Sequence, residues 1–150
     1  MAMFISRSPD ETVALGERWG REAQPGWVIG LIGDLGAGKT QLVKGIARGL
    51  EVIARVHSPT FALLHEYNDG RLPLFHLDLY RLETRAEMVA AGLEEYFCRP
   101  NGVTVVEWAE RWFGPVSCCE FQASASRLRR VRLEVLSDTQ RRITYEDSGL

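Results

Sequence analysis

One short segment of the chain carries the residue types and spacing of a phosphate-binding loop. Gly33-Asp34-Leu35-Gly36-Ala37-Gly38-Lys39-Thr40 matches the pattern G-x-x-x-x-G-K-S/T at every fixed position. In such a loop the glycines let backbone N–H groups point inward at phosphate oxygens, the lysine reaches the β- and γ-phosphates, and the hydroxyl is a Mg²⁺ ligand. The Lys39-Thr40 pair argues against an ordinary glycine-rich turn. The motif therefore predicts binding of a nucleoside triphosphate such as ATP together with Mg²⁺, with Thr40 as a metal ligand.

The residues on either side of this loop have the pattern that a phosphate-binding loop requires. Residues 27–32 form an apolar run of strand length, and residues 41–50 carry apolar side chains at helical spacing, with Gly49 as a candidate stop. A helix that begins near Lys39 adds the positive end of its dipole to the loop. The predicted nucleotide contacts in this segment are Gly36, Ala37, Gly38, Lys39 and Thr40.

Two apolar runs end in a carboxylate, and the pattern alone does not decide which acid serves the metal ion. Residues 103–107 have the composition of a buried strand and end in Glu107, while residues 74–78 end in Asp78. The carboxyl ends of parallel strands meet beside such a loop, so an acid there can offset the charge of Mg²⁺ directly or through water. Both acids are therefore candidates for catalysis.

Asp78 has two readings on the sequence alone. Strand alternation places His76, Asp78 and Tyr80 on one face of the predicted strand. An aspartate in a mostly apolar strand needs a partner, because burying it unpaired is costly. Arg81 could provide a structural salt bridge, but we favour a position beside Mg²⁺ or the attacking water.

Three further segments carry candidate nucleotide contacts. Ser58, Pro59 and Thr60 form either a mobile loop that brings a hydroxyl to the γ-phosphate or a plain turn, and the spacing favours neither. Thr12 lies near the start of a helix with the capping pattern Ser-Pro-Asp-Glu, where it could touch the base. Trp108 beside Glu107 belongs to the core, or stacks on the base, or forms a partner surface.

The remaining patterns predict the rest of an α/β domain. Turn residues 68–71 separate two strand-like runs, and a second pair of runs closes the chain. The expected elements are a helix over 9–23, a hairpin over 61–78, a helix capped by Thr84, a strand over 103–107 and a hairpin over 129–145. We expect the arginines at the start of the last hairpin to form a solvated face, with Arg141 or Arg142 near the nucleotide.

Composition limits the class of protein further. The 150 residues are 45% hydrophobic and 25% charged, which is typical of one globular domain over 1–150. A net charge of −2 argues against binding nucleic acid by charge alone. No apolar run is long enough to span a membrane, and residues 1–7 lack the apolar core of a signal peptide. Because Cys118 and Cys119 are adjacent, we do not expect the cysteines to bind zinc. We expect reduced thiols in a cytoplasmic protein.

The motifs that are missing narrow the choice among phosphate-loop proteins. A GTPase would carry N-K-x-D and D-x-x-G runs, which this sequence lacks. A small-molecule kinase needs an acceptor pocket and an arginine-bearing lid, and residues 114–132 offer arginines and little else. A weak ATPase whose product is a conformational change, or a nucleotide-gated binding module, therefore fits better, with the small-molecule kinase as the alternative.

Four motifs in order resemble the bacterial TsaE family, the ATPase needed to make threonylcarbamoyladenosine next to the anticodon of tRNA. They are the phosphate loop 33–40, Ser58-Pro59-Thr60-Phe61, His76-Leu77-Asp78-Leu79-Tyr80-Arg81-Leu82 and Val106-Glu107-Trp108-Ala109. The resemblance covers residues 9–110 well and the last hairpin more loosely. It implies a P-loop NTPase fold, a three-layer sandwich with a mostly parallel central sheet plus antiparallel hairpin strands.

The resemblance also implies partners and roles. Members bind the complex of the transferase subunit and its inactive paralogue, and hydrolysis of ATP resets that complex between turnovers; whether tRNA is contacted directly stays open. By resemblance, Thr40 and Glu107 hold Mg²⁺, Asp78 supports hydrolysis, residues 58–60 sense the nucleotide, and Trp108 matters for activity, beside the catalytic Lys39 of the loop.

The sequence departs from the family pattern in three places. Gln41 stands where the family usually has threonine, so this predicted nucleotide contact differs at the α-phosphate. His57 before Ser58 is less typical, and the stretch between Trp112 and Arg129 is longer than usual, with an unmatched cysteine pair.

Overall fold

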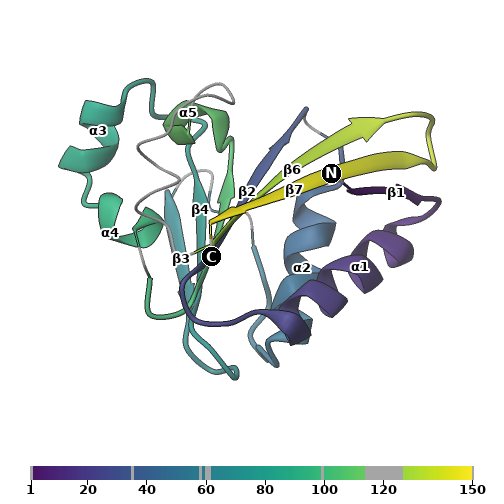
Figure 1. The fold of residues 1–150 in the computed structure, drawn as a ribbon, viewed down its shortest axis with the longest axis horizontal. Coiled ribbons are helices and arrows are strands. Elements are labelled where there is room, and N and C mark those ends of the chain that lie inside the picture. The colour runs from purple at the N-terminus through teal and green to yellow at the C-terminus, as the bar shows by residue number, and fades with distance from the viewer. Residues whose placement is uncertain are drawn as a thin grey trace.

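The computed structural model describes residues 2–34, 36–57, 59, 62–98, 100–113 and 127–149. They form one seven-stranded sheet with helices (Figure 1). The strands are β1 (Ala2–Ser6), β2 (Trp27–Gly33), β3 (Leu64–Tyr67), β4 (Leu74–Asp78), β5 (Val103–Glu107), β6 (Arg127–Val135) and β7 (Arg141–Gly149). Their order across the sheet is β1-β7-β6-β2-β5-β4-β3.

The centre of the sheet is parallel and its two edges are antiparallel. Strand β2 pairs in parallel with β5 on one side and β6 on the other, and β4 pairs in parallel with β5. The hairpins β3–β4 and β6–β7 add the antiparallel pairings, and β1 pairs antiparallel with β7. The predicted mixed α/β sheet with a parallel core and two hairpins is confirmed, whereas β1 was not predicted.

The helices in the described residues include two that begin at capping residues which the sequence indicates. The helices are α1 (Pro9–Glu22), α2 (Lys39–Gly49), α3 (Arg85–Ala90), α4 (Glu94–Phe97) and α5 (Glu110–Phe113). Ser8 caps α1 by accepting from Glu11 N, and Thr84 caps α3 by accepting from Glu87 N. These bonds satisfy helix N–H groups that have no partner within the helix. None of the helices in the described ranges is long and apolar enough to cross a membrane.

Two apolar cores lie on opposite faces of the sheet. The first joins α1 and α2 to β2 and β5 through side chains such as Trp19, Ile29 and Ile46. The second joins α3, α4 and α5 to the other face through side chains such as Met88 and Phe97. Figure 1 shows the two groups of helices on either side of the strands. Each strand of the parallel centre is therefore covered on both faces, as parallel sheets require.

Helices α1 and α2 pack through four glycines. An added Cβ at Gly16 or Gly20 would collide with backbone of α2, and one at Gly45 or Gly49 would collide with backbone of α1. The glycines therefore allow the two helix backbones to approach closely. Helix α2 ends at Gly49 as predicted, but the residue with positive φ is Glu51, at 64°. Glycine is needed at position 49 because the backbone of α1 leaves no room for a side chain there.

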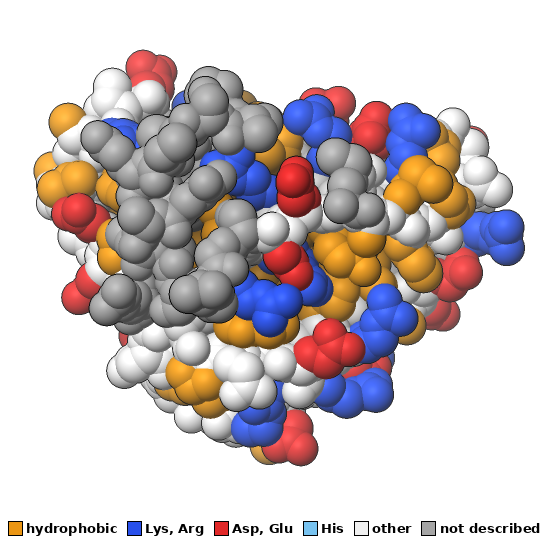
Figure 2. Space-filling view, viewed as in Figure 1, with side chains coloured by type: hydrophobic (Ala, Val, Ile, Leu, Met, Phe, Trp, Pro, Cys, Tyr) orange, Lys and Arg blue, Asp and Glu red, His pale blue; other side chains and the backbone are white. Residues whose placement is uncertain are grey.

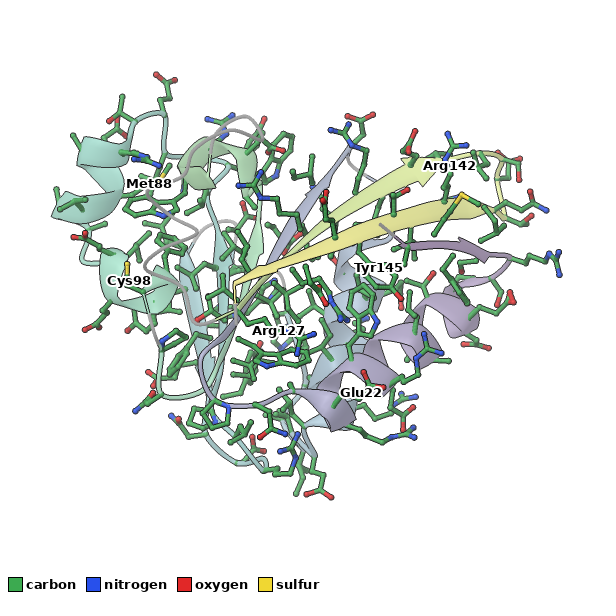
Figure 3. The ribbon with its side chains drawn as sticks, in the orientation of Figure 1. Glu22, Met88, Cys98, Arg127, Arg142 and Tyr145 are labelled. Carbon is green, nitrogen blue, oxygen red and sulfur yellow. The ribbon has the colours of Figure 1, made fainter. Side chains whose placement is uncertain are left out.

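Arg129 contradicts the expectation of a solvated arginine face. Its side chain is buried, and it donates to both oxygens of Asp147 at 2.7 and 2.9 Å. The hydrogen bonds from Arg129 hold the pKa of Asp147 below its usual range. Its guanidinium also lies 4.8 Å from the ring centre of Trp19 and 4.9 Å from that of Tyr145. Figure 3 shows Tyr145 between β7 and α1, so this cluster joins the last hairpin to the first helix.

The glycine contact between α1 and α2 can be tested by adding one methyl group. We expect Gly45→Ala to lower the free energy of unfolding by about 1–3 kcal/mol, because its Cβ would overlap the carbonyl oxygen of Val13 and force the helices apart. Urea-induced unfolding followed by circular dichroism measures the change. Lys44→Ala, at the exposed neighbouring position, is the matched control and should change stability by less than about 0.5 kcal/mol. Equal stability of the two variants would contradict the contact.

Candidate functional site

A pocket of about 590 Å³ opens where β2, β4 and β5 end and α2 begins. Its walls combine the glycine loop, the two candidate acids, the start of α1 and the turn between β6 and β7. The lining residues are Ser8, Pro9, Thr12, Gly36, Gly38, Lys39, Thr40, Gln41, Asp78, Tyr80, Glu107, Trp108, Asp138, Thr139 and Arg141. The structure thus gathers, from five separate segments, most of the site residues that the sequence nominates.

The glycine loop has the backbone that the motif predicts. Gly36 and Gly38 have φ of 81° and 98°, a conformation that side-chain-bearing residues rarely adopt. An added Cβ at Gly36 would meet nothing within 4 Å, so the glycine is required there by backbone conformation. Ala37 between them is buried and donates its N–H to Asp34 O at 3.1 Å. Helix α2 starts directly after Gly38, so its first N–H groups lie at the pocket.

Lys39 is held inside the site by its own loop. Its Nζ donates to Gly33 O at 2.7 Å, and the residue is only 6% exposed. The same Nζ lies 4.4 Å from the ring centre of Trp108, a cation–π distance. Trp108 has a φ of 59°, and its ring centre is 5.1 Å from that of Tyr80. The lysine is therefore largely desolvated and directed by a carbonyl oxygen and an aromatic face.

The two candidate acids lie side by side. Asp78 and Glu107 are paired residues in the parallel register of β4 and β5, so their side chains leave the same face of the sheet. Both are buried, with exposed fractions of 3% and 4%. Asp78 Oδ1 accepts the N–H of Tyr80 at 2.9 Å. The structure brings both acids to the pocket that Lys39 enters, so each of the two apolar runs that end in an acid delivers its carboxylate there.

Glu107 has a partner to which the sequence pattern assigned no role. His76 Nε2 lies 2.7 Å from Glu107 Oε2, and both side chains are buried. Alternation did place His76 on the face of Asp78, which the strand confirms. The missing information was the register between β4 and β5, because residues 76 and 107 become neighbours only after the strands pair.

The sequence that carries these motifs matches the model of a known protein family. The family model described as "Threonylcarbamoyl adenosine biosynthesis protein TsaE" matches residues 6–143. The chain belongs to the TsaE family. Bacillus subtilis TsaE is 44% identical over 95% of this chain and 83% of its own length, and Treponema pallidum TsaE is 40% identical over 93% and 96%. The crystal structure of Bacillus subtilis YdiB is similar with a TM-score of 0.75 and 36% identity, covering 99% of this chain and 86% of that one.

In this TsaE family member, the far end of the pocket is formed by segments that the motifs do not mark. Thr12 lies there as predicted, and its Oγ1 is 2.6 Å from the Oγ of Ser6, a residue of the unpredicted strand β1. Arg141 donates to Gly36 O at 3.1 and 3.3 Å, which links the last hairpin to the glycine loop. Arg142, the other arginine considered, instead pairs with Glu134.

Some predicted contacts of this TsaE family member are not placed. Ser58 and Thr60 lie outside the residues that the structure describes, as do Cys118 and Cys119. Pro59 between them is buried, and its carbonyl accepts from Leu63 N at 2.7 Å. The role of residues 58–60 as a nucleotide-sensing loop stays a prediction.

The face of this TsaE family member drawn in Figure 2 does not carry one dominant sign of charge over its described residues. Figure 2 shows acidic and basic side chains interspersed over the viewed face, with hydrophobic side chains between them. This mixture agrees with the net charge of −2. The described residues on the viewed face therefore form no broad positive field.

Glu110, a half-buried acid two residues after Trp108, makes a pH-dependent contribution to the stability of the fold. Burial raises the pKa of Glu110 above its ordinary value of 4.5, although Lys39 and Arg111 oppose the shift. Within the described part of the chain, nothing hydrogen-bonds to its buried Oε1. The folded state therefore binds this proton more tightly than the unfolded state, and stability falls as pH rises above about 4.5 through the raised pKa.

Replacing this carboxyl tests the sign of that effect. We expect Glu110→Gln to be more stable relative to the parent protein at pH 7 than at pH 4, because only the parent must ionise a half-buried group between these values. Thermal unfolding of both proteins across this range measures the difference. A difference in stability that stays constant with pH would contradict the assignment.

Proposed function

We propose that this chain is a Mg²⁺-dependent ATPase that acts in threonylcarbamoyladenosine modification of tRNA. The observation that supports it is the convergence, in one pocket, of the glycine loop, Lys39, Thr40 and the two buried acids. Family membership supports the tRNA-modification role, since the curated relatives carry that description. The geometry supports a P-loop NTPase arrangement in a three-layer α/β fold.

The pocket fits a nucleoside triphosphate in size and in donors. Its volume of about 590 Å³ lies in the range of small-molecule sites. Gly36 and Gly38 turn the loop without side chains, and the N-terminus of α2 presents N–H groups and a positive dipole end to an anion. Lys39 adds the full positive charge. The predicted contacts Gly36, Gly38, Thr40, Gln41 and Thr12 then follow the phosphates and the rest of the nucleotide.

The same pocket has donors that suit Mg²⁺. The hydroxyl of Thr40 and the carboxylate of Glu107 are hard oxygen ligands, and both residues line the pocket. When bound, Mg²⁺ neutralises charge on the β- and γ-phosphate oxygens. Asp78, next to Glu107 in the register, is the carboxylate that we assign to orienting the attacking water. Lys39 stabilises the negative charge that develops on the transferred group.

The proposed partners are the two other proteins of the modification complex, the transferase subunit and its inactive paralogue. We propose that nucleotide binding and hydrolysis in this cytoplasmic protein reset that complex between turnovers. A weak intrinsic rate that rises with the partners present fits a site whose product is a conformational change. A small-molecule kinase is the alternative, and it would transfer the phosphoryl group to an added acceptor instead of water.

Lys39 provides the direct test of nucleotide binding. We expect Lys39→Ala to lose measurable ATP binding while keeping its fold. The substitution removes the positively charged residue of the glycine-loop motif, which is the group that can pair with phosphate. Isothermal titration calorimetry with ATP and Mg²⁺ measures affinity, and circular dichroism checks the fold. Lys44→Ala on the exposed face of α2 is the matched control and should bind as the parent does. Unchanged affinity in Lys39→Ala would refute the assignment.

The two acids test the hydrolytic step. We expect Asp78→Asn and Glu107→Gln to keep ATP binding in EDTA but to lower phosphate release in Mg²⁺ by at least ~10-fold, about 1.4 kcal/mol of transition-state stabilisation. Phosphate release is measured with and without the transferase pair, and Glu94→Gln at an exposed position is the control. Full turnover in both variants would move the catalytic role elsewhere. Formation of ADP and a phosphorylated acceptor, without phosphate release, when a small-molecule acceptor is added would favour the kinase.

A further inference from the structure

The buried pair formed by His76 and Glu107 points to a role for the histidine that neither motif spacing nor family description supplies. His76 lies on β4 opposite Val105, and Glu107 lies on β5 opposite Asp78. The two side chains are therefore diagonal neighbours on one face of the sheet. His76 is fully buried and its Nε2 is 2.7 Å from Glu107 Oε2. At that distance the contact is a short, charge-assisted hydrogen bond.

The hydrogen-bond pattern around the ring fixes where its proton lies. An ionised carboxylate only accepts, so His76 Nε2 must carry the hydrogen and donate it to Glu107. Among the residues that the structure describes, none bonds to His76 Nδ1. A second N–H buried there would lack an acceptor, which is costly. Among the described residues, the hydrogen bond of the ring is therefore the one that Nε2 makes with Glu107, and its Nδ1 has no hydrogen-bond partner there.

Stability alone does not explain such a pair. Buried polar pairs are often replaceable by apolar residues of similar volume without loss of stability, since desolvation offsets their attraction. The apolar strand around His76 would accommodate such a residue, because Leu74 and Val105 on the same face are fully buried. What the pair does provide is orientation. The backbone of Glu107 is already fixed by Leu79 N, which donates to its carbonyl at 3.1 Å, but its long side chain is not.

We propose that His76 is the positioning residue of this site: its Nε2–H holds one oxygen of Glu107 and leaves the other for the metal ion. This proposal rests on the proposed function, in which Glu107 is a Mg²⁺ ligand. The buried ring orients the carboxylate through this one hydrogen bond. Outer groups that hold a metal ligand in this way typically contribute a 10–100-fold effect on metal affinity or activity.

The test compares substitutions that keep or remove the donor at the position of Nε2. The amide nitrogen of His76→Gln can take the place of Nε2, whereas the shorter side chain of His76→Asn cannot reach Glu107, and His76→Leu has no donor. Thr104→Val on β5 is the control for losing a buried polar atom, because Thr104 is fully buried on the opposite face. If His76→Leu does not fold, the comparison of the two amide variants decides.

Metal-dependent binding separates positioning from a structural role. ADP affinity is measured by calorimetry in EDTA and in Mg²⁺, together with kcat and KM for phosphate release. We expect His76→Asn and His76→Leu to bind ADP in EDTA as the parent does, but to lose at least ~10-fold of the gain in affinity that Mg²⁺ provides and of kcat, with KM for ATP in Mg²⁺ raised along with the lost affinity. His76→Gln and Thr104→Val should keep both. A full Mg²⁺ gain in His76→Asn would overturn the proposal.

Crystal structures of the nucleotide-free variants distinguish failure of this proposal from failure of the proposed function. We expect the Glu107 carboxylate to move in His76→Asn and to stay in place in His76→Gln. An unmoved carboxylate in His76→Asn would overturn the positioning role even if the parent protein hydrolyses ATP. A carboxylate that moves in His76→Asn supports the positioning role even in a parent protein that fails to bind ATP, in which case only the proposed function fails.

Discussion

The parallel pairing of β2, β5 and β4 determines where this protein can do chemistry. Because these strands run in one direction, their carboxyl ends share one edge of the sheet, and the residues that follow them meet. Strand β2 continues into the glycine loop, while β4 and β5 end in Asp78 and Glu107. Covering both faces of these strands with helices keeps water from their sides, so the charges at this edge are buried and act at low dielectric.

Burying charge at that edge requires that the charges offset one another. Lys39 is 6% exposed, and Asp78 and Glu107 are 3% and 4% exposed. Each has a defined polar partner: Gly33 O for the lysine, Tyr80 N for the aspartate and His76 for the glutamate. The formal charges of the one lysine and the two acids sum to one negative charge. Burying these charges is tolerable because each is paired with a polar group.

The sequence predicted the structural features that arise from residues close together in the chain. The glycine loop, the helix caps at Ser8 and Thr84 and the hairpin turns arise from residues a few positions apart, and the structure contains each of them. The pair of His76 with Glu107 and the burial of Arg129 depend on strand register and on partners far along the chain. No local pattern encodes those contacts, so they could not be read in advance.

Glycines illustrate the same limit in another way. Gly36 and Gly38 were expected because the loop motif needs a backbone whose N–H groups point inward, and the structure gives both residues a positive φ. Gly45 and Gly49 on α2 look in sequence like weak points of a helix or a stop signal. Their cause is the backbone of α1 passing within contact distance, a relation visible only once both helices lie on the sheet. This close packing carries the start of α1, and with it Thr12, to the edge of the pocket.

Trp108 shows how the site prepares its lysine for a ligand. Its φ of 59° costs about 1–2 kcal/mol for a residue with a side chain, so the surrounding structure must favour it. That conformation places the ring 4.4 Å from Lys39 Nζ, beside Tyr80 and 5.6 Å from the guanidinium of Arg111. A cation–π contact contributes about 0.5–2 kcal/mol, less than a charge-assisted bond to phosphate in a buried site. The ring therefore holds the desolvated ammonium group in place without the strength of an ion pair.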